Sequence, residues 1–294
     1  MSKPLFDKLA LIGIGLIGSS IARVARQENL AGTISAATRR RETAEEARAL
    51  NIVDEIGTDP VAAVRDADFV VLCTPVGANA EAMAQIAPHL KQGAIVSDVG
   101  SVKQAVIRDV GPLVPEGVHF VPAHPVAGTE HSGPAAGFPE LFKGRWCIVT
   151  PIPGSDRAAV DKVVEFWRRC GSDMEEMSAE HHDKILAITS HLPHLIAYTI
   201  VGTATDLEDD IKSEVIKFAA GGFRDFTRIA ASDPTMWRDV FLNNREAVLE
   251  MLGRFSEDIT ALQRAIRWGE GDKLFELFER TRAIRRALID ARQA

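Results

Sequence analysis

A glycine-rich segment near the amino terminus constrains the fold of this 294-residue chain more than any other feature. The segment Gly13-Ile14-Gly15-Leu16-Ile17-Gly18 fits the pattern G-x-G-x-x-G; it follows the apolar run Leu9–Ile12 and opens a stretch with helical periodicity. In a strand–turn–helix context these glycines let a pyrophosphate approach the backbone at a helix N-terminus. The segment therefore predicts a Rossmann-type dinucleotide site contacted by Gly13, Gly15, Leu16, Ile17 and Gly18. A glycine-rich turn without a ligand is the alternative.

The first part of the chain alternates between strand-like and helical segments. Apolar runs predict strands at Leu9–Gly13, Thr33–Ala37, Phe69–Cys73, Ala94–Ser97, Val118–Val121, Trp146–Thr150 and Asp173–Met177. Amphipathic stretches predict helices at Leu16–Asn29, Glu42–Leu50, Asn79–His89, Val102–Val110 and Ser155–Cys170. Such alternation predicts an α/β fold with a doubly wound, mostly parallel sheet.

Helical patterns dominate after about Glu180, where no further strand is expected. We therefore expect a dinucleotide-binding domain over residues 1–180 and an all-helical substrate and dimerisation domain over 181–294. Ser232-Asp233-Pro234 is typical of a helix start, and apolar residues spaced by three and four continue to Ile266. They predict one helix of roughly 50 Å, followed by a last helix from about Asp272 to Arg292. So long a helix in so small a domain predicts a homodimer.

Composition narrows the classes of partner and compartment. The net charge of −7 argues against nucleic-acid and membrane-surface partners, and three widely spaced cysteines suit a reducing, cytoplasmic compartment. Lys3 and Lys8 precede the apolar stretch Leu9–Ala22, so a secretory segment is an alternative there, although glycines at phosphate-loop spacing interrupt it. No other segment is expected to reach the ~20 apolar residues of a membrane helix.

The residues after the second strand bear on the choice of nicotinamide cofactor. An NAD enzyme places an acid there to bind the ribose 2′-OH, whereas this chain has Thr38-Arg39-Arg40. Because arginine binds phosphate with paired, charge-assisted hydrogen bonds, these residues predict a preference for NADP over NAD. An NAD enzyme in which Arg39 only stacks on the adenine is the alternative. Thr74 and Pro75, which follow the strand at Phe69–Cys73, complete the expected cofactor contacts.

Five further motifs span both halves of the chain. They are Asp98-Val99-Gly100-Ser101-Val102-Lys103, His124-Pro125-Val126-Ala127-Gly128-Thr129-Glu130, Ser190-His191-Leu192-Pro193-His194, Gly221-Gly222-Phe223-Arg224-Asp225-Phe226-Thr227-Arg228, and Ser232-Asp233-Pro234 continuing to Met236-Trp237. In type and order they resemble the prephenate/arogenate (cyclohexadienyl) dehydrogenases. The resemblance implies oxidative decarboxylation of prephenate and/or arogenate to 4-hydroxyphenylpyruvate and/or tyrosine, with hydride transfer to NAD(P), in tyrosine biosynthesis.

The resemblance assigns the catalytic role to His124. We expect His124 at the C-terminal end of the strand Val118–Val121, where ligands of parallel sheets collect. An imidazole has a suitable pKa to take the proton of the substrate 4-hydroxyl; a loop-capping histidine is the alternative. The Ser101 hydroxyl is expected to bond the substrate oxygen or to hold His124, and it could equally cap the helix from Val102.

The resemblance also implies that Arg228 binds a substrate carboxylate. We expect Asp225 to orient Arg228 from one turn earlier, and an exposed Asp–Arg pair is the alternative. His194 is preferred over His191 as a substrate contact. Buried structural histidines and a metal-binding pair remain alternatives, although no metal-ligand spacing in the chain is convincing. Pro193 is expected to kink the helix between them.

Weaker expectations concern the neighbours of these residues. Trp237 walls the substrate pocket or belongs to the core, and Thr129 and Glu130 are further substrate candidates, with Glu130 near the substrate side chain. His181 and His182 are expected at the surface or at the domain junction. Tyrosine, if it inhibits, is expected to compete in the substrate cleft, because the chain lacks the length of a fused chorismate mutase or effector domain.

Two other functions are open at this point. A β-hydroxyacid dehydrogenase or imine reductase shares the two-domain plan, but it would place a catalytic Lys or Asp where this chain has His191 to His194. A non-catalytic NADP sensor would keep the glycine loop without needing both His124 and Arg228. The residues do not decide between prephenate and arogenate.

Overall fold

The computed structural model describes residues 3–206, 214 and 217–290. The chain divides into two compact units, Met1–Arg245 and Glu246–Ala294, which are described separately here. The boundary expected between residues 180 and 181 lies inside the first unit and stays a prediction.

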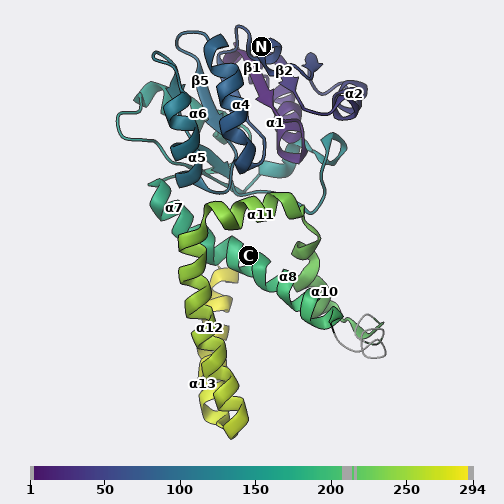
Figure 1. Cartoon of the computed structure of the whole chain (residues 1–294), viewed down its shortest axis with the longest axis vertical. Helices are drawn as coiled ribbons and strands as arrows, with labels where there is room; N and C mark the ends of the chain where they lie inside the picture. Colours follow the sequence, from purple (N-terminus) through teal and green to yellow (C-terminus); the bar gives the residue numbers. More distant parts are fainter. Residues whose placement is uncertain (1–2, 207–213, 215–216, 291–294) are drawn as a thin grey trace. The chain divides into compact units, whose positions relative to one another are not determined.

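The first unit is built on a six-stranded sheet. Its strands are β1 (Phe6–Ile12), β2 (Ala31–Ala37), β3 (Glu55–Gly57), β4 (Phe69–Leu72), β5 (Ile95–Asp98) and β6 (His119–Phe120). They pair in the order β3-β2-β1-β4-β5-β6, and every pair is parallel. Strands β1, β2 and β5 of this sheet are labelled in Figure 1. The predicted doubly wound parallel sheet is therefore confirmed.

Helices cover both faces of this sheet, as alternating side chains of β4 show. Phe69 and Val71 belong to a buried cluster with residues of α1 (Leu16–Gln27) and α6 (Arg157–Arg169). Val70 and Leu72 belong to a second cluster with residues of α3 (Pro60–Val64), α4 (Asn79–Ile86) and α5 (Lys103–Val110). Burial on both faces explains why these strands are continuously apolar.

Two short elements of the first unit were not expected from the sequence. Edge strand β3 has only three residues, and α3 has five, too few for a periodic pattern to be recognised. The remaining short helices are α2 (Arg41–Ala49) and the 3-10 turns Val76–Ala78, Ala87–His89, Gly111–Leu113, Pro134–Ala136, Pro139–Phe142 and Arg228–Ala231.

A separate three-stranded sheet carries the expected catalytic histidine. Its strands are β7 (Ala123–Pro125), β8 (Trp146–Val149) and β9 (Asp173–Glu176); β7 runs antiparallel and β9 parallel to β8. His124 is paired with Ile148 within β7 and does not lie at the end of a main-sheet strand, so that expectation was wrong. The amide of Val121 still bonds Val96, but Pro122 has no amide to continue the ladder.

Helices follow the small sheet. They are α7 (Ala179–Leu186), a π-helical turn (Ala187–His191), α8 (Leu192–Thr205), α10 (Gly221–Thr227) and α11 (Pro234–Asn243). The expected kink at Pro193 takes the form of this wide turn, because proline lacks the amide that would continue regular helical bonding.

The single long helix expected from Pro234 to Ile266 is wrong. The structure breaks it at Asn244 into α11 and α12 (Arg245–Trp268), because the Asn244 side chain turns inward to buried hydrogen-bond partners. Helix α12, with 24 residues, begins one residue before the second unit, which also contains α13 (Gly271–Asp290). The last two residues of the expected final helix lie outside the described residues.

The continuous helical stretch Ala179–Thr205 is long and apolar enough to cross a membrane by length and composition. The expectation that no segment reaches this length was therefore too strong. The first half of the stretch contributes His182, Asp183 and His191, which are buried and hydrogen-bonded within the first unit. These polar contacts are typical of a core helix in a globular protein.

Candidate active site

The glycine loop after β1 has the close-packed geometry that its pattern predicts. Gly13 has φ +104°, and a Cβ there would lie 2.6 Å from the carbonyl oxygen of Cys73. A Cβ on Gly18 would lie 2.3 Å from the carbonyl oxygen of Gly13. A Cβ on Gly15, in contrast, would have no atom within 4 Å. Gly15 is the capping residue of α1, and no side chain at this position bonds the first amides of the helix. The loop thus leaves open space at a helix N-terminus, where a pyrophosphate fits.

The loop lies where the sheet order reverses, between β1 and β4. The loop after β4 carries Thr74 and Pro75 to the same edge, where Thr74 Oγ1 donates a hydrogen bond to Asn79 Oδ1 at 2.6 Å. Beyond the end of β2, Thr38 is half-buried, and Arg39 and Arg40 are exposed. This arrangement fits the phosphates and ribose of a dinucleotide at a topological switch point.

The backbone before His124 is held by a buried ion pair. Asp98, at the end of β5, and Lys103, at the start of α5, form the pair, and both side chains are fully buried. Lys103 Nζ donates to the carbonyl oxygen of Ala123 at 2.7 Å, and the amide of Ala123 donates to Asp98 Oδ1 at 3.3 Å. Burial lowers the pKa of Lys103, and Asp98 partly offsets that effect. This clamp was not foreseen from the motif that contains both residues.

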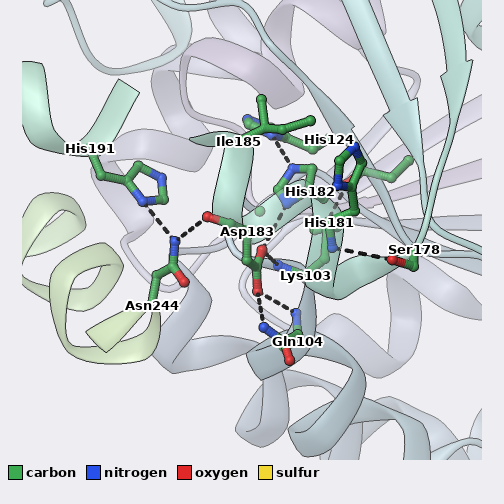
Figure 2. Close-up of polar contacts among 12 residues, drawn as sticks. Lys103, Gln104, His124, Ser178, His181, His182, Asp183, Ile185, His191 and Asn244 are labelled. Atoms are coloured by element: carbon green, nitrogen blue, oxygen red, sulfur yellow. Dashed lines mark hydrogen bonds and ion pairs between the residues drawn. The ribbon is translucent and has the colours of Figure 1, made fainter. Parts of the chain in front are cut away.

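The ring of His124 begins a chain of buried hydrogen bonds (Figure 2). Its Nδ1 lies 2.9 Å from Nε2 of His182, and Nδ1 of His182 lies 2.7 Å from Oδ1 of Asp183. The Asp183 carboxylate also accepts hydrogen bonds from the amides of Lys103 at 2.8 Å and Gln104 at 2.9 Å. His182, expected at the surface or at the domain junction, is fully buried against His124 and so does not lie at the surface, while His181 is exposed.

Burial determines the charge state of these groups. Desolvation lowers the pKa of His124 well below its ordinary value, with further lowering by His182 and Lys103. Desolvation also lowers the pKa of His182, although Asp183 opposes this effect. Burial alone would raise the pKa of Asp183, but hydrogen bonds from His182, Lys103 and Gln104 bring it below its usual range. At neutral pH both imidazoles are therefore neutral and Asp183 is ionised.

Ser101 does not cap the helix that follows it. Helix α5 begins at Lys103 with no side-chain bond from its capping residue, and the Asp183 carboxylate binds the first two amides instead. Among the described contacts there is no hydrogen bond between Ser101 and the His124 ring, whose Nδ1 contact is with His182. Ser101 is half-buried in the loop between β5 and α5, and its contact with a substrate oxygen stays a prediction.

The two histidines around Pro193 have different surroundings. His191 is fully buried, with Nδ1 3.0 Å from Nδ2 of Asn244 and no partner for Nε2 among the described residues. His194 is half-buried; its Nδ1 lies 2.8 Å from the carbonyl oxygen of Ser190, and its ring stacks on Trp237 with centroids 3.7 Å apart. Trp237 is itself buried within the cluster on the α4–α5 face, so it packs in the core and also supports His194.

Arg228 is joined to the loop that follows β7. Its Nη1 lies 2.7 Å from Oε2 of Glu130, and the side chains are 57% and 26% exposed. The guanidinium therefore meets Glu130, and the expected pairing with Asp225 is not found among the described contacts. Thr129 Oγ1, in the same loop, accepts the amide of His131 at 3.2 Å. Since His124 and Glu130 are six residues apart, this pair brings the helical segment to the loop that leaves the histidine strand.

This arrangement can carry out proton transfer beside a dinucleotide. It offers a neutral, buried imidazole as a base and a half-exposed guanidinium for an anion. Across the described part of the chain, no group of three or more His, Cys, Asp or Glu side chains could hold a metal ion.

The sheet order and the glycine loop define a Rossmann-type nucleotide-binding protein with a helical region beyond the sheet. The family model described as prephenate dehydrogenase, nucleotide-binding domain, matches residues 21–176. The model described as prephenate dehydrogenase, dimerization domain, matches residues 178–280. The chain belongs to the prephenate dehydrogenase family, as its motifs indicated.

Similar proteins cover nearly the whole chain. A cyclohexadienyl dehydrogenase of Zymomonas mobilis is 42% identical over 96% of this chain and 96% of its own length. A prephenate dehydrogenase of Bacillus subtilis is 32% identical over 96% of this chain and 76% of its own. The crystal structure of Aquifex aeolicus prephenate dehydrogenase, in complex with hydroxyphenyl propionate and NAD+, has a TM-score of 0.89 and 32% identity, covering 98% of this chain and 99% of that one.

Proposed function

We propose that this protein oxidises and decarboxylates prephenate and/or arogenate, forming 4-hydroxyphenylpyruvate and/or tyrosine in tyrosine biosynthesis. The observation that carries the proposal is the buried, neutral imidazole of His124, fixed in a sheet domain with an open dinucleotide loop. Membership of the prephenate dehydrogenase family selects this reaction from those that such a base could serve.

His124 is the proposed catalytic base. It accepts the proton of the ring 4-hydroxyl, and the Ser101 hydroxyl bonds the same substrate oxygen. When bound, the nicotinamide accepts the hydride from ring C4. The bond between C1 and its carboxylate then breaks; CO₂ leaves, and the electron pair completes the aromatic ring as a phenolate, which takes the proton back from His124 to give the phenol. Burial around His124 keeps water from protonating the base.

Arg228 is the proposed anchor for a substrate carboxylate. A guanidinium offers two parallel donors to a carboxylate, and here, among the described contacts, only Nη1 is bonded to Glu130, so the other nitrogens can meet the substrate. His194, supported by Trp237, is the proposed second contact, because it is less buried than His191. His191, Thr129 and Glu130 are kept as weaker substrate candidates.

For the cofactor we propose binding at Gly13, Gly15, Leu16, Ile17 and Gly18, with Thr74 and Pro75 on the neighbouring loop. The open space above Gly15 supports this placement. NADP is the proposed preference, since Arg39 and Arg40 are exposed beside Thr38 where a 2′-phosphate would lie. NAD remains the alternative, and the Aquifex aeolicus relative was crystallised with it.

We also propose a cytoplasmic homodimer; tyrosine, if it inhibits, is proposed to compete in the substrate cleft. Large apolar side chains exposed on α12 and α13 support a partner copy, among them Leu249, Ile266, Trp268 and Phe275. Light scattering should then give twice the chain mass of 32.0 kDa. The three cysteines are free, as suits a reducing compartment.

Steady-state kinetics with prephenate, arogenate and a 3-hydroxy acid, each with NAD and NADP, test the proposal. We expect turnover of one or both cyclohexadienes and none of the 3-hydroxy acid. His124→Asn should lower kcat by about 10²–10⁴-fold, the usual contribution of general base catalysis, with unchanged nucleotide binding. Turnover of the 3-hydroxy acid would favour a β-hydroxyacid dehydrogenase. Nucleotide binding without any turnover would favour a sensor.

A further inference from the structure

We propose that His182 and Asp183 are positioning residues that hold His124 as the tautomer with its proton on Nδ1. In this tautomer Nε2 carries the free electron pair and is the atom that accepts the substrate proton. The inference rests on the proposed function for the identity of the proton donor, but the tautomer is a property of the protein alone.

The assignment begins at the Asp183 carboxylate. Two backbone amides, those of Lys103 and Gln104, donate to its two oxygens at 2.8 and 2.9 Å. An ionised carboxylate can only accept hydrogen bonds, so the proton in the 2.7 Å contact with His182 must lie on Nδ1 of His182.

The proton positions of both rings then follow in sequence (Figure 2). In a neutral imidazole one nitrogen donates and the other accepts, so Nε2 of His182 is an acceptor. It lies 2.9 Å from Nδ1 of His124, which must therefore be the donor. Nε2 of His124 is left without a proton. A doubly protonated His182 would reverse this result, because both of its nitrogens would donate.

The surroundings favour the neutral His182 that the assignment needs. His182 and Asp183 are buried, so water does not compete for their hydrogen bonds. Desolvation is the largest effect that lowers the pKa of His182, and Lys103 lowers it further, against the opposing effects of Asp183 and Asp98. Asp183 meanwhile binds the amino-terminal amides of α5, where the helix dipole stabilises a negative charge. One carboxylate thus caps a helix and orients a ring.

The arrangement is similar to the acid–histidine pairs in which an acid orients a catalytic base. Here a second histidine, His182, lies between the acid, Asp183, and the base, His124. In serine proteases the acid holds the tautomer of the base, and its loss costs about 10⁴ in kcat. Here the intervening ring fixes His124 by one hydrogen bond, and His124 is also held through the backbone of Ala123. We therefore expect a smaller loss when His182 is removed, on the order of 10²-fold.

Imidazole ¹⁵N NMR of the wild-type protein without ligands tests the tautomer directly. The chain has eight histidines, and His124→Asn assigns the signals of the His124 ring. At pH 7 we expect a protonated Nδ1 and a bare Nε2 for His124. A proton on Nε2 of His124 would overturn the inference. This measurement needs neither turnover nor a folded His182 variant.

Two substitutions at His182 test the positioning role. His182→Leu removes the acceptor and should lower kcat about 10²-fold, with little change in KM. His182→Gln can place its Oε1 near the former Nε2, so it should recover at least about tenfold of that loss. His181→Leu is the matched control, because His181 is exposed on the same helix; its kcat should equal that of the wild type.

The outcomes separate this inference from the proposed function. Equal kcat values for His182→Leu and the wild type would remove the positioning role while leaving the reaction intact. The expected NMR tautomer in a protein that turns over neither cyclohexadiene would remove the proposed function while leaving the tautomer assignment in place.

Discussion

At the scale of single residues, Arg228 shows how the site is arranged before substrate arrives. Its guanidinium is half-exposed and bonded to Glu130. Arg228→Ala should raise KM for the cyclohexadiene acid more than it lowers kcat. The expected loss in kcat/KM is about 10- to 100-fold, since hydrogen bonds to charged groups contribute roughly 1.5–3 kcal/mol. Arg224→Ala, on α10 directly before the turn that carries Arg228, is the control and should leave both constants near their wild-type values.

Thr38 is the residue on which the cofactor preference is tested. A carboxylate in its place would accept hydrogen bonds from a ribose 2′-OH and repel a 2′-phosphate. Thr38→Asp should shift the ratio of kcat/KM for NADP over NAD toward NAD by about tenfold or more, or ~1.4 kcal/mol. Arg41→Ala should leave the ratio unchanged, because Arg41 pairs with Glu45 on α2. A wild type that already uses NAD tenfold better than NADP would contradict the proposed preference.

The residues found from the sequence and those missed differ in a physical way. His124 and Arg228 stand in recognisable motifs, whereas His182 and Asp183 stand in a short polar run at a helix start, which looks solvent-exposed. Their burial depends on contacts with Lys103 and His124, which are 80 and 58 residues away in the chain. No local pattern carries that information.

At the scale of elements, Asn244 lies between α11 and α12 and bonds two groups of the first unit. Its Nδ2 donates to the carbonyl oxygen of Asp183 at 2.9 Å and lies 3.0 Å from Nδ1 of His191. Asn244→Ala leaves Nδ1 of His191 without this partner and removes one of the two donors to the Asp183 carbonyl, which still accepts the amide of Ala187, and it should lower the free energy of unfolding by about 1–3 kcal/mol. Urea denaturation measures this change.

Asn243 provides the control for that substitution. It is the neighbouring asparagine, and its Nδ2 bonds only the backbone of Asp239 one turn earlier. Asn243→Ala should cost less than about 1 kcal/mol. If both variants lowered the free energy of unfolding equally, the buried contacts of Asn244 would not be the source of its stabilising effect.

Periodicity predicted most elements but not their interruptions. The apolar spacing of α11 continues into α12, so the sequence pattern gave no sign of a break at Asn244. The break depends on where one amide side chain finds partners, which is a tertiary effect. The strands β3 and β7, three residues each, are likewise defined by their pairing rather than by any pattern of their own.

At the scale of the whole molecule, three buried histidines should make stability depend on pH. Burial lowers the pKa of His191 to about 4 and also lowers those of His124 and His182. Below about pH 6.5 the unfolded chain binds protons that the folded chain does not. Stability should therefore be constant above pH 7 and fall below 6.5, by up to ~1.4 kcal/mol per pH unit for each histidine.

Urea denaturation at pH 7.5 and 5.5 measures this dependence, with the mid-point compared at constant ionic strength. His181→Leu should show the same slope as the wild type, since that ring is exposed. A free energy of unfolding that is equal at both values would mean that these rings are not held in their neutral form.

The plan of the sheet was predictable because strand and helix alternate regularly, and a parallel sheet follows from that alternation. The small sheet was not predictable from the sequence. Two of its strands, Trp146–Val149 and Asp173–Glu176, look like further strands of the main parallel sheet. Only the interruption at Pro122 and the antiparallel pairing of β7 with β8 separate them from the main sheet.

The bond between Arg228 and Glu130 places a carboxylate of the protein on the proposed substrate anchor. An incoming acid therefore shares the guanidinium with Glu130 or displaces it, and its measured affinity depends on how strongly Glu130 binds the same cation. Evolution can then retune which acids are accepted, or how readily product departs, by altering the resident competitor alone. Homologues with identical substrate-contacting groups can in this way differ in selectivity.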